Sequence, residues 1–442
     1  MQVRELTNEY LDLIKSDMDK SKESYEKAIN YIENSTAIYH GEHIRFPYVP
    51  KLYTTEVIDY FKYIAMTTHT ILCKIINKYI EDEEYRKLFP FSKELEELIL
   101  CENYYEQPLP ITRIDLFLNE EDFTFKFCEF NADGASAMNE DRELNNAYKD
   151  DEIFNQFSKK YNISHFELFD SWVDEFLNIY DTFKYKVEKP TIGIIDFMES
   201  ATNEEFKVFK SRFEKRGYDT VIADITTLKY DDGLYTKDGV KIDAVYRRAV
   251  TSEMMEKIEK IPAFIKAIKD KKTCIIGSMR TQVIHNKIVY MIMHKKETFD
   301  FLTAEEILFI KDHIPYTCWL NDGVFDREKV ISNKDSWIIK PDDLYGARGV
   351  YAGVDYSKEK FTKLIDENTN NGYLLQEYAA MYKTKNFIKE KNGEFVFDEF
   401  SNMPGIFIYN GKFKGLYSRG GRQGIICEAA GGIAMCSMHV EI

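Results

Sequence analysis

A change in side-chain periodicity at residues 108–134 constrains the fold of this chain more than any other feature. The sequence before it has apolar residues at helical three- and four-residue spacing, whereas PLPITRIDLFLNEEDFTFKFCEFNADG alternates with a period of two. Two strand-like runs, 111–118 and 124–131, flank the polar loop NEEDF. This pattern predicts an antiparallel β-hairpin.

The second strand of this hairpin ends in polar residues that continue the two-residue spacing of its aromatic residues. Phe123, Phe125 and Phe127 alternate, and Glu129 and Asn131 follow them at the same two-residue spacing. Since residues two apart share a face of a strand, a carboxylate and an amide are expected on the phenylalanine face. We interpret this as a strand that leaves the core and enters a ligand cleft.

The first strand supplies two further polar residues, Arg113 and Asp115, which also share a face. The expected register pairs Leu118 with Thr124, sets Arg113 opposite Glu129, and brings Asp115 close to Phe127. Carboxylate and amide oxygens are hard donors that suit Mg²⁺, and arginine offers a fixed fork for a phosphoryl group. The alternative is a buried Arg–Glu pair between the strands, with Asn131 capping the turn that follows.

Composition narrows the class of protein. The chain has 442 residues, of which 44% are hydrophobic, and this length predicts roughly two to four domains or one large mixed α/β body. The net charge is -16, and the sequence shows no basic face. These features argue against a nucleic-acid partner.

We also expect a cytoplasmic protein with no membrane partner. The N-terminal residues lack the apolar core of a signal peptide, and the most apolar helix-like run, 63–79, is interrupted by charged side chains. The 7 cysteines are widely spaced, which is typical of reduced thiols rather than of disulfides or a zinc site. Cys436 and His439 are close in sequence, but a catalytic pair is assembled across a fold rather than by local spacing.

The rest of the chain divides by pattern into further regions. Within residues 190–285, strands such as TIGIIDF and TCIIGS alternate with helical segments, which is typical of a βαβ unit with a parallel sheet. Near the C-terminus, Asn410-Gly411 predicts a two-residue turn between two strands. The expected domains are an N-terminal helical region (1–105), the hairpin with the helices after it (106–189), a Rossmann-like subdomain (190–285) and a nucleotide-binding region (286–442).

Three segments of the last region carry candidate ligand-binding residues. In SWIIKPDDLYGARG, Lys340 ends a strand and a glycine loop follows, so backbone N–H groups could approach a phosphate; an ordinary hairpin turn is the alternative. In GYLLQEYA, Gln376 and Glu377 could bind an adenine or ribose edge, or simply end a strand. Arg419 lies in the glycine-rich GLYSRGGRQG, which is either a loop that closes on a ligand or, as we favour locally, a frayed tail.

Taken together and in this order, the motifs resemble a known family. TRIDLF followed by FKFCEFNADG resembles the synthetase domain of glutathionylspermidine synthases, and WIIKP…GARG, YLLQEY and GLYSRGG occur in the same order as later motifs of that family. The resemblance implies a circularly permuted ATP-grasp fold of the α/β class, with a Rossmann-like pre-ATP-grasp subdomain and an N-terminal helical region.

The resemblance also assigns roles to residues of this chain. It implies that ATP and Mg²⁺ are the cofactors, with Asp115, Glu129 and Asn131 as metal ligands. Arg113 and Arg419 would stabilise the phosphoryl group or the acyl phosphate. The implied ATP-binding residues are Lys340, Gly346, Arg348, Gly349, Gln376, Glu377 and Tyr378.

The implied reaction joins a carboxylate and an amine, each on a small molecule or a peptide, through an acyl phosphate. One departure from the family is that Gly372 occupies the place of its usual second ATP lysine. This departure motivates an alternative, an ATP-binding sensor or scaffold without ligase activity. A small-molecule kinase is a further alternative.

Overall fold

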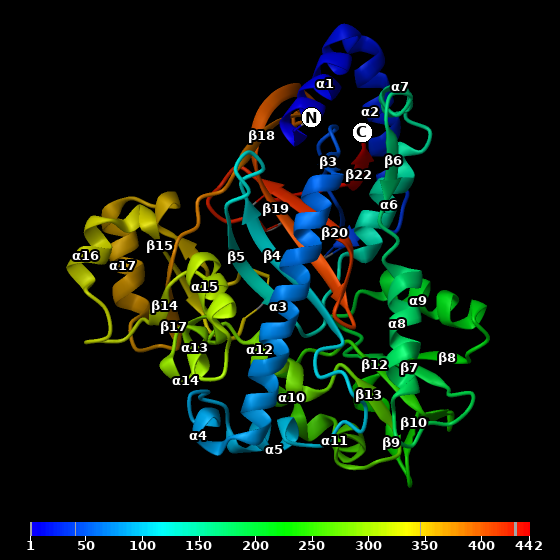
Figure 1. Ribbon diagram of the computed structural model, residues 1–442. Coiled ribbons are helices and arrows are strands. Elements are labelled where there is room, and N and C mark those ends of the chain that lie inside the picture. The colour runs from blue at the N-terminus through cyan, green and yellow to red at the C-terminus, as the bar shows by residue number, and fades with distance from the viewer. Residues whose placement is uncertain (1, 40, 345, 428–430) are drawn as a thin grey trace.

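The predicted hairpin lies at one end of the largest sheet. The computed structural model describes residues 2–39, 41–344, 346–427 and 431–442 (Figure 1). The sheet contains β4 (Ile111–Leu118), β5 (Phe125–Asn131), β18 (Lys383–Lys389), β19 (Phe395–Tyr409), β20 (Lys412–Gly421) and β21 (Ile433–Met435). Its order is β21-β20-β19-β4-β5, with β18 paired to β19, and all these pairs are antiparallel.

A β-bulge in β5 changes the expected register. Leu118 pairs with Phe125, not with Thr124, so the half of the hairpin next to the turn pairs even residues with odd ones. The register then shifts between Asp115 and Leu116, because β5 contains one extra residue, Cys128. Beyond the bulge, Asp115 lies opposite Glu129, and Arg113 lies opposite Asn131. The predicted pairing of Arg113 with Glu129, and of Asp115 near Phe127, is therefore wrong.

The bulge also moves the polar residues to the opposite face of the strand. Phe125, Phe127 and Phe130 are buried in the main core, and neighbouring rings among them lie 5.2 Å apart. Glu129 and Asn131 face the other way, together with their cross-strand partners. The expectation that they share the phenylalanine face is therefore wrong.

The long helix α3 (Thr55–Glu81) covers one face of this sheet (Figure 1). It packs against β19 and β20 because its apolar residues recur at helical spacing, as Val57, Phe61 and Ile64 illustrate. At the far end of β19, Asn410 and Gly411 have φ angles of 49° and 77° and form the predicted two-residue turn.

The last described strand pairs with two distant segments of the chain in a separate small sheet. β22 (Ser437–Glu441) lies between β3 (Lys51–Thr54) and β6 (Asn162–His165), parallel to the first and antiparallel to the second. α1 (Val3–Ser16) and α2 (Met18–Glu33) lie close to this sheet (Figure 1). A fully buried ion pair between Lys51 and Glu120, 2.5 Å apart, links β3 to the hairpin loop.

The predicted parallel sheet lies within residues 190–285. Its strands are β7 (Ile192–Asp196), β8 (Thr220–Asp224), β12 (Ala244–Arg247) and β13 (Cys274–Ile276), in the order β13-β12-β7-β8. α8 (Phe169–Asp181), α9 (Asn203–Lys215), α10 (Thr251–Glu256) and α11 (Pro262–Lys269) accompany the sheet, and β9 (Lys229–Tyr230), β10 (Leu234–Tyr235) and β11 (Lys241–Ile242) form a short meander. The continuous apolar runs of β7, β12 and β13 are explained by their burial, whereas β8 is mostly only partly buried.

A smaller lobe follows in the sequence and projects from the main body (Figure 1). Its sheet contains β14 (Thr317–Trp319), β15 (Trp337–Pro341), β16 (Tyr351–Ala352) and β17 (Tyr373–Glu377), in the order β14-β17-β15-β16. α16 (Arg327–Ser332) and α17 (Lys358–Asn368) cover it and share a small core of their own, which includes Phe361 and Ile365.

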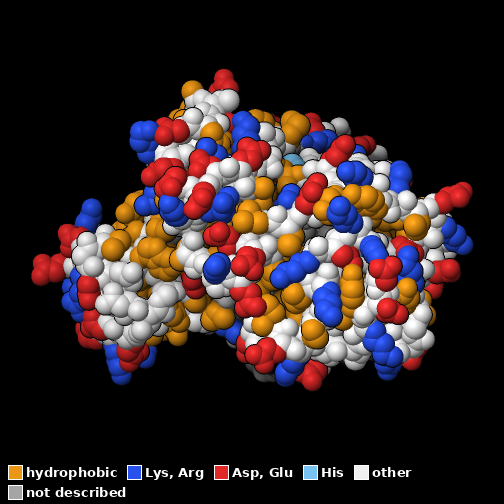
Figure 2. All heavy atoms as spheres, turned by 90° about the horizontal axis from the view of Figure 1, so that it is seen from below, with side chains coloured by type: hydrophobic (Ala, Val, Ile, Leu, Met, Phe, Trp, Pro, Cys, Tyr) orange, Lys and Arg blue, Asp and Glu red, His pale blue; other side chains and the backbone are white. Residues whose placement is uncertain are grey.

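The remaining elements are short connections between these units. They are β1 (Ile38–Tyr39), β2 (Glu42–His43), α4 (Glu83–Arg86), α5 (Lys93–Ile99), α6 (Met138–Tyr148), α7 (Glu152–Phe157), α12 (Gln282–His285), α13 (Val289–Met293), α14 (Lys296–Phe299) and α15 (Ala304–His313). Among the described residues, no helix combines the length and the apolar character that crossing a membrane requires. On the face that Figure 2 shows, basic and acidic side chains are interspersed with apolar ones.

Candidate active site

A large cavity lies between the six-stranded sheet and the smaller lobe. Its volume is about 610 Å³, which is within the usual size range of small-molecule sites. All the candidate residues line it except Asp115, which is buried behind its surface, and Gly349. We call the side formed by Arg113, Asp115, Glu129, Asn131 and Arg419 the hairpin wall. We call the side formed by Lys340, residues 346–349 and residues 376–378 the lysine wall.

Asp115 is the centre of the hairpin wall. Its carboxylate accepts two hydrogen bonds from Arg113, at 2.9 and 3.1 Å, and one from Arg419 at 2.5 Å. Burial alone would raise the pKa of Asp115, but the two guanidinium groups outweigh it and lower the pKa below its usual value. Asp115 is 0% exposed, so this ion pair fixes both arginines without itself facing the cavity.

The same carboxylate orients Asn131. The amide Nδ2 of Asn131 donates to Asp115 at 2.9 Å, and a carboxylate oxygen can only accept. The amide oxygen of Asn131 is therefore directed away from Asp115 and is available to a cation in the cavity. Asp115, predicted as a direct metal ligand, is occupied by three neighbouring side chains in this structure.

Glu129 lines the cavity next to Asn131 and has a lysine partner that the sequence did not reveal. The Nζ of Lys287 lies 3.4 Å from its carboxylate. Burial would raise the pKa of Glu129, but the ammonium group of Lys287 contributes to lowering it, so the carboxylate is the stable form. A carboxylate and an amide oxygen side by side are the hard donors that Mg²⁺ takes, so these two residues fit the predicted metal.

Lys340 is held at the base of the lysine wall. Its side chain is largely buried, and its Nζ donates to Gln376 Oε1 at 2.8 Å and to the carbonyl of Cys128 at 3.4 Å. Gln376 in turn donates to Thr317 at 2.9 Å. Lys340 therefore reaches from its own sheet to the bulge of β5 and joins the two sides of the cavity.

The glycine loop after Lys340 contains backbone in the left-handed region. Gly346, Ala347 and Gly349 have φ angles of 67°, 55° and 69°, in the left-handed region that glycine adopts without strain. A Cβ on Gly349 would lie 2.6 Å from Tyr373 Oη, so no larger residue fits there unless the ring moves. Arg348 lines the cavity, with an exposed side chain.

The C-terminal arginine segment is a strand rather than a tail. Arg419 lies within β20, where it pairs with Met403 of β19 and Ala434 of β21. The prediction that this segment is a frayed tail is therefore wrong. Tyr378 Oη donates to the carbonyl of Gly424 at 3.2 Å, which connects the lysine wall to the segment after β20. The carboxylate of Glu377 accepts from the backbone N–H of Tyr316 at 3.0 Å.

The loop between the hairpin and α6 forms a further part of the cavity surface that sequence reasoning missed. Asp133 is 2.5 Å from Arg247 and also accepts from the backbone N–H of Thr251 at 2.6 Å. Gly134 has φ +66°, and a Cβ there would lie 2.8 Å from the carbonyl of Arg248. These contacts fix the loop against the carboxyl ends of the parallel strands, where ligands of open α/β sheets bind.

Lys287 and His285 are further cavity residues that sequence reasoning missed. His285 ends α12 and Lys287 lies in the short connection to α13, and this stretch carries no glycine pattern or strand end of the kind that marked Lys340. The backbone N–H of Lys287 donates to the carbonyl of Asp342 at 3.0 Å, so the connection is attached to the glycine loop. This contact joins residues far apart in the chain, and local periodicity does not predict it.

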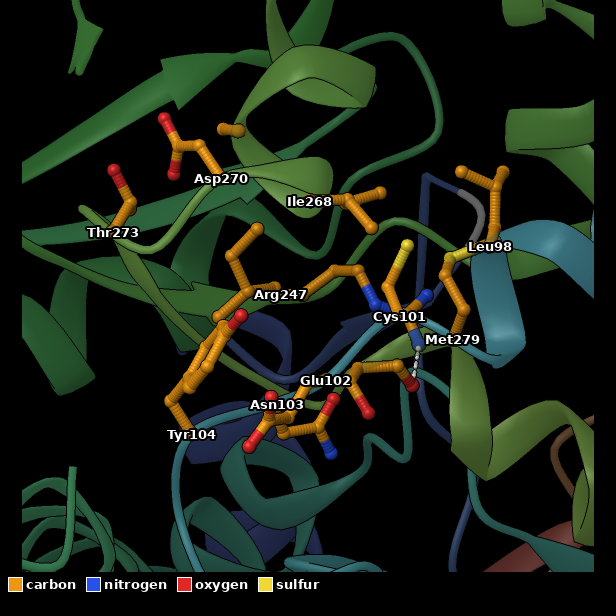
Figure 3. A pocket seen from close by; sticks show the side chains of 13 residues that line it. Leu98, Cys101, Glu102, Asn103, Tyr104, Arg247, Ile268, Asp270, Thr273 and Met279 are labelled. Carbon is orange, nitrogen blue, oxygen red and sulfur yellow. Dashed lines mark hydrogen bonds between the residues drawn. The ribbon is translucent and has the colours of Figure 1, made fainter. Parts of the chain in front are cut away.

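A second hollow lies between residues 98–104 and the parallel sheet (Figure 3). Its volume is about 20 Å³, which holds roughly one water molecule. It borders Arg247, Ser278 and Thr273, and the hydroxyl groups of the last two have no protein partner within the described chain. A buried water suits this hollow, whereas a substrate does not.

The architecture places the chain among proteins of mixed α/β structure with a glutathione synthetase-like fold. A glutathione synthetase-like effector, GSS30, from Globodera pallida, solved in the apo form, superposes with a TM-score of 0.58. The match covers 94% of this chain and 96% of that one, at 11% sequence identity. No protein-family model matches the sequence, and no curated protein does either. The structural match therefore establishes the fold and not the activity.

Proposed function

We propose that this protein is an ATP-dependent ligase of the ATP-grasp type, which joins a carboxylate to an amine through an acyl phosphate. The observation that carries the proposal is the convergence in one cavity of Glu129 and Asn131 with Lys287 and Lys340 and a pair of arginines. These groups come from four separate parts of the chain: the hairpin, the segment after α12, β15 and β20. Together they provide the cation-binding oxygens and the positive charges that phosphoryl transfer requires.

The lysine wall and Lys287 would bind the nucleotide. Lys340 and Lys287 would neutralise the phosphates, and the N–H groups of the glycine loop would approach them closely. Gln376, Glu377 and Tyr378 would border the adenine. Gly372 occupies the place of the family's usual second ATP lysine. Lys287 would replace that lysine, because its ammonium group reaches the cavity from another segment.

The hairpin wall would bind the reacting phosphoryl group. Glu129 and Asn131 would hold Mg²⁺, which when bound neutralises charge on the transferring phosphoryl group. Asp115 would keep the amide of Asn131 and both arginines in place. The Nε–H of Arg419 is buried and has no acceptor among the described residues, so an anion bound here would satisfy it.

The proposed reaction has two steps. In the first step, an oxygen of the substrate carboxylate attacks the γ-phosphorus of ATP, the bond to the β–γ bridging oxygen breaks, and ADP leaves. In the second step, the amine nitrogen attacks the acyl carbon, inorganic phosphate leaves with the C–O bonding pair, and the nitrogen loses a proton. Arg113 and Arg419 would stabilise the negative charge that develops in both steps.

A screen of ADP release tests this proposal. Candidate acids and amines, drawn from amino acids, short peptides, thiol peptides and polyamines, are supplied with ATP and Mg²⁺, and products are identified by mass. We expect ADP and phosphate only when an acid and an amine are both present, together with an amide product. Glu129→Gln should reduce the rate roughly 100-fold, because the metal loses a charged ligand. Glu297→Gln, on the short exposed helix α14, is the matched control.

Two other outcomes would contradict the proposal. A stable phosphorylated product that needs no amine would identify a small-molecule kinase. Binding of ATP without turnover across the whole panel would instead favour a sensor or scaffold.

A further inference from the structure

Three potential metal-binding side chains meet outside the large cavity. They are Asp141 of α6, His165 at the end of β6 and Cys436 just before β22. One ligand atom from each lies within 4.8 Å of the other two. Asp141 and Cys436 are buried and His165 is partly buried, and none of the three lines the large cavity.

The neighbours of this cluster offer little positive charge or hydrogen bonding to offset the buried negative charge of Asp141. His165 Nε2 lies 2.6 Å from one oxygen of Asp141, and the other oxygen accepts only a long 3.4 Å bond from the backbone N–H of Ser437. Within the described ranges, no lysine or arginine forms an ion pair with Asp141. Burial, reinforced by the charge of Asp141, raises the pKa of Cys436 above its ordinary value.

The donor types match one cation well. Thiolate sulfur, imidazole nitrogen and carboxylate oxygen are the three ligand types that Zn²⁺ binds in proteins. A divalent ion would balance one thiolate and one carboxylate with a neutral imidazole, so the buried complex would carry no net charge. This removes the cost of an uncompensated buried charge. The burial of Cys436 argues against the other use of a Cys–His–Asp set, nucleophilic catalysis, because a substrate has no access to the sulfur.

We propose that Asp141, His165 and Cys436 bind a single Zn²⁺ ion, with water in the fourth position. The sequence predicted no zinc site, because its histidines and cysteines lack the usual local spacing. The site is instead assembled from three distant segments. His439, the histidine closest in sequence to Cys436, is bonded to Thr55 Oγ1 at 3.0 Å and is not part of the cluster.

The position of the cluster gives the ion a structural role. α6 directly follows the loop that forms part of the cavity surface, and Cys436 directly follows β21, in which Ala434 pairs with Arg419. An ion at the cluster would therefore connect two segments that border the candidate active site. It would also hold β22 in the small sheet that it forms with β3 and β6.

Metal content is the direct test. The full chain is purified without metal-affinity chromatography, dialysed against metal-free buffer, and analysed by mass spectrometry for zinc. We expect about one zinc per chain in the wild type and less than about one tenth of that in Cys436→Ala. The matched control is Cys274→Ala, which removes an equally buried thiol that belongs to no such cluster. It should retain zinc at the wild-type level.

Cobalt substitution supplies a second, independent measurement. Loading the zinc-free protein with Co²⁺ should produce a thiolate-to-cobalt absorption band that is absent in Cys436→Ala. If that variant does not fold, His165→Gln at the partly exposed position should also reduce zinc at least about tenfold.

Two results would overturn the proposal. One is a wild type that neither retains zinc nor gives the cobalt band; the other is zinc retention in Cys436→Ala equal to that of the wild type. In the first case the cluster is only a buried His–Asp ion pair. Neither result depends on ligase turnover, so the zinc site and the proposed function are tested separately.

Discussion

The hairpin wall and the lysine wall of the cavity hold their polar side chains by different means. In the hairpin wall, one buried carboxylate, Asp115, receives hydrogen bonds from Arg113, Asn131 and Arg419. In the lysine wall, Lys340 rests on a neutral glutamine, and the loop after it contains backbone in the left-handed region. The first wall belongs to the large core, whereas the second belongs to a lobe with a small core of its own.

This difference indicates a division of labour in the proposed reaction. Charges that are fixed by buried ion pairs need no reorganisation when a phosphoryl group is transferred. A lobe with a small separate core can move as a unit around a nucleotide. The comparison therefore predicts that loss of the central charged side chain of the hairpin wall, Asp115, affects folding and turnover together, whereas loss of the charge of Lys340 in the lysine wall affects turnover alone.

The largest expected effect is that of Asp115→Ala. This change leaves one buried and one partly buried arginine without their shared counter-ion, so we expect unfolding free energy to fall by about 3–5 kcal/mol and ligase turnover to be lost. Urea denaturation and ADP release measure the two effects. The matched control is Asp366→Ala, which removes an aspartate from an exposed bidentate pair with Arg327 and should cost less than about 1 kcal/mol. A variant with wild-type stability would contradict the role of Asp115 as the centre of this wall.

Lys340→Met should have the second-largest effect, and on turnover only. Methionine keeps most of the buried stem and removes the ammonium group, so ADP release should fall roughly 100-fold with the unfolding free energy changed by less than about 1 kcal/mol. Lys358→Met, at the exposed start of α17 in the same lobe, is the control and should leave both quantities unchanged. If Lys340→Met destabilised the protein as strongly as Asp115→Ala, the contrast between the walls would fail.

Hydrogen exchange should separate the two sheets. We expect amides of β15 and β17 to exchange at least about tenfold faster than those of β4 and β19, because the smaller lobe buries fewer apolar side chains. Adding ATP and Mg²⁺ should slow exchange mainly in the smaller lobe. Equal protection of the two sheets without ligand would show that they open together.

The smallest expected effect concerns the glycine loop. Gly349→Ala combines a left-handed φ of +69° with a Cβ that would lie 2.6 Å from Tyr373 Oη, so it should cost about 1–2 kcal/mol and raise the KM for ATP. Gly323→Ala, in the same lobe, has φ +77° but nothing within 4 Å of the added atom. The difference between the two variants in thermal unfolding measures the close packing of the loop. Identical effects would indicate that backbone strain alone determines the cost.

Local pattern predicted much of the fold, because its signals lie within short stretches of sequence. The alternation in the hairpin, the apolar strands of the parallel sheet and the Asn410-Gly411 turn each reflect backbone geometry over a few residues. The candidate residues of both walls also stand in alternating strands, at strand ends or in glycine loops, so most could be named from the sequence. The assignment of Asp115 as a direct metal ligand and the assignment of the nucleotide contacts remain predictions.

What could not be predicted depends on contacts across the fold. Nothing within 124–131 shows that β5 accommodates an extra residue, since a bulge is defined by how β5 pairs with β4. Lys287 reaches Glu129 only because two distant segments fold together. The cluster of Asp141, His165 and Cys436 has the same origin, and its members have no common sequence motif.

The bulge at Cys128 reverses which face of β5 the odd-numbered residues occupy. Because Cys128 has no partner across the hairpin, deleting it would leave Phe127 opposite Leu116 and Glu129 opposite Asp115, so Glu129 and Asn131 would still face the cavity. Flattening the bulge while Cys128 is kept would do the damage, since regular pairing would then set Glu129 opposite Ile114 and turn the carboxylate toward the aromatic core. The hairpin wall would therefore survive a strand shortened by one residue, but not a strand of the present length that pairs without a bulge.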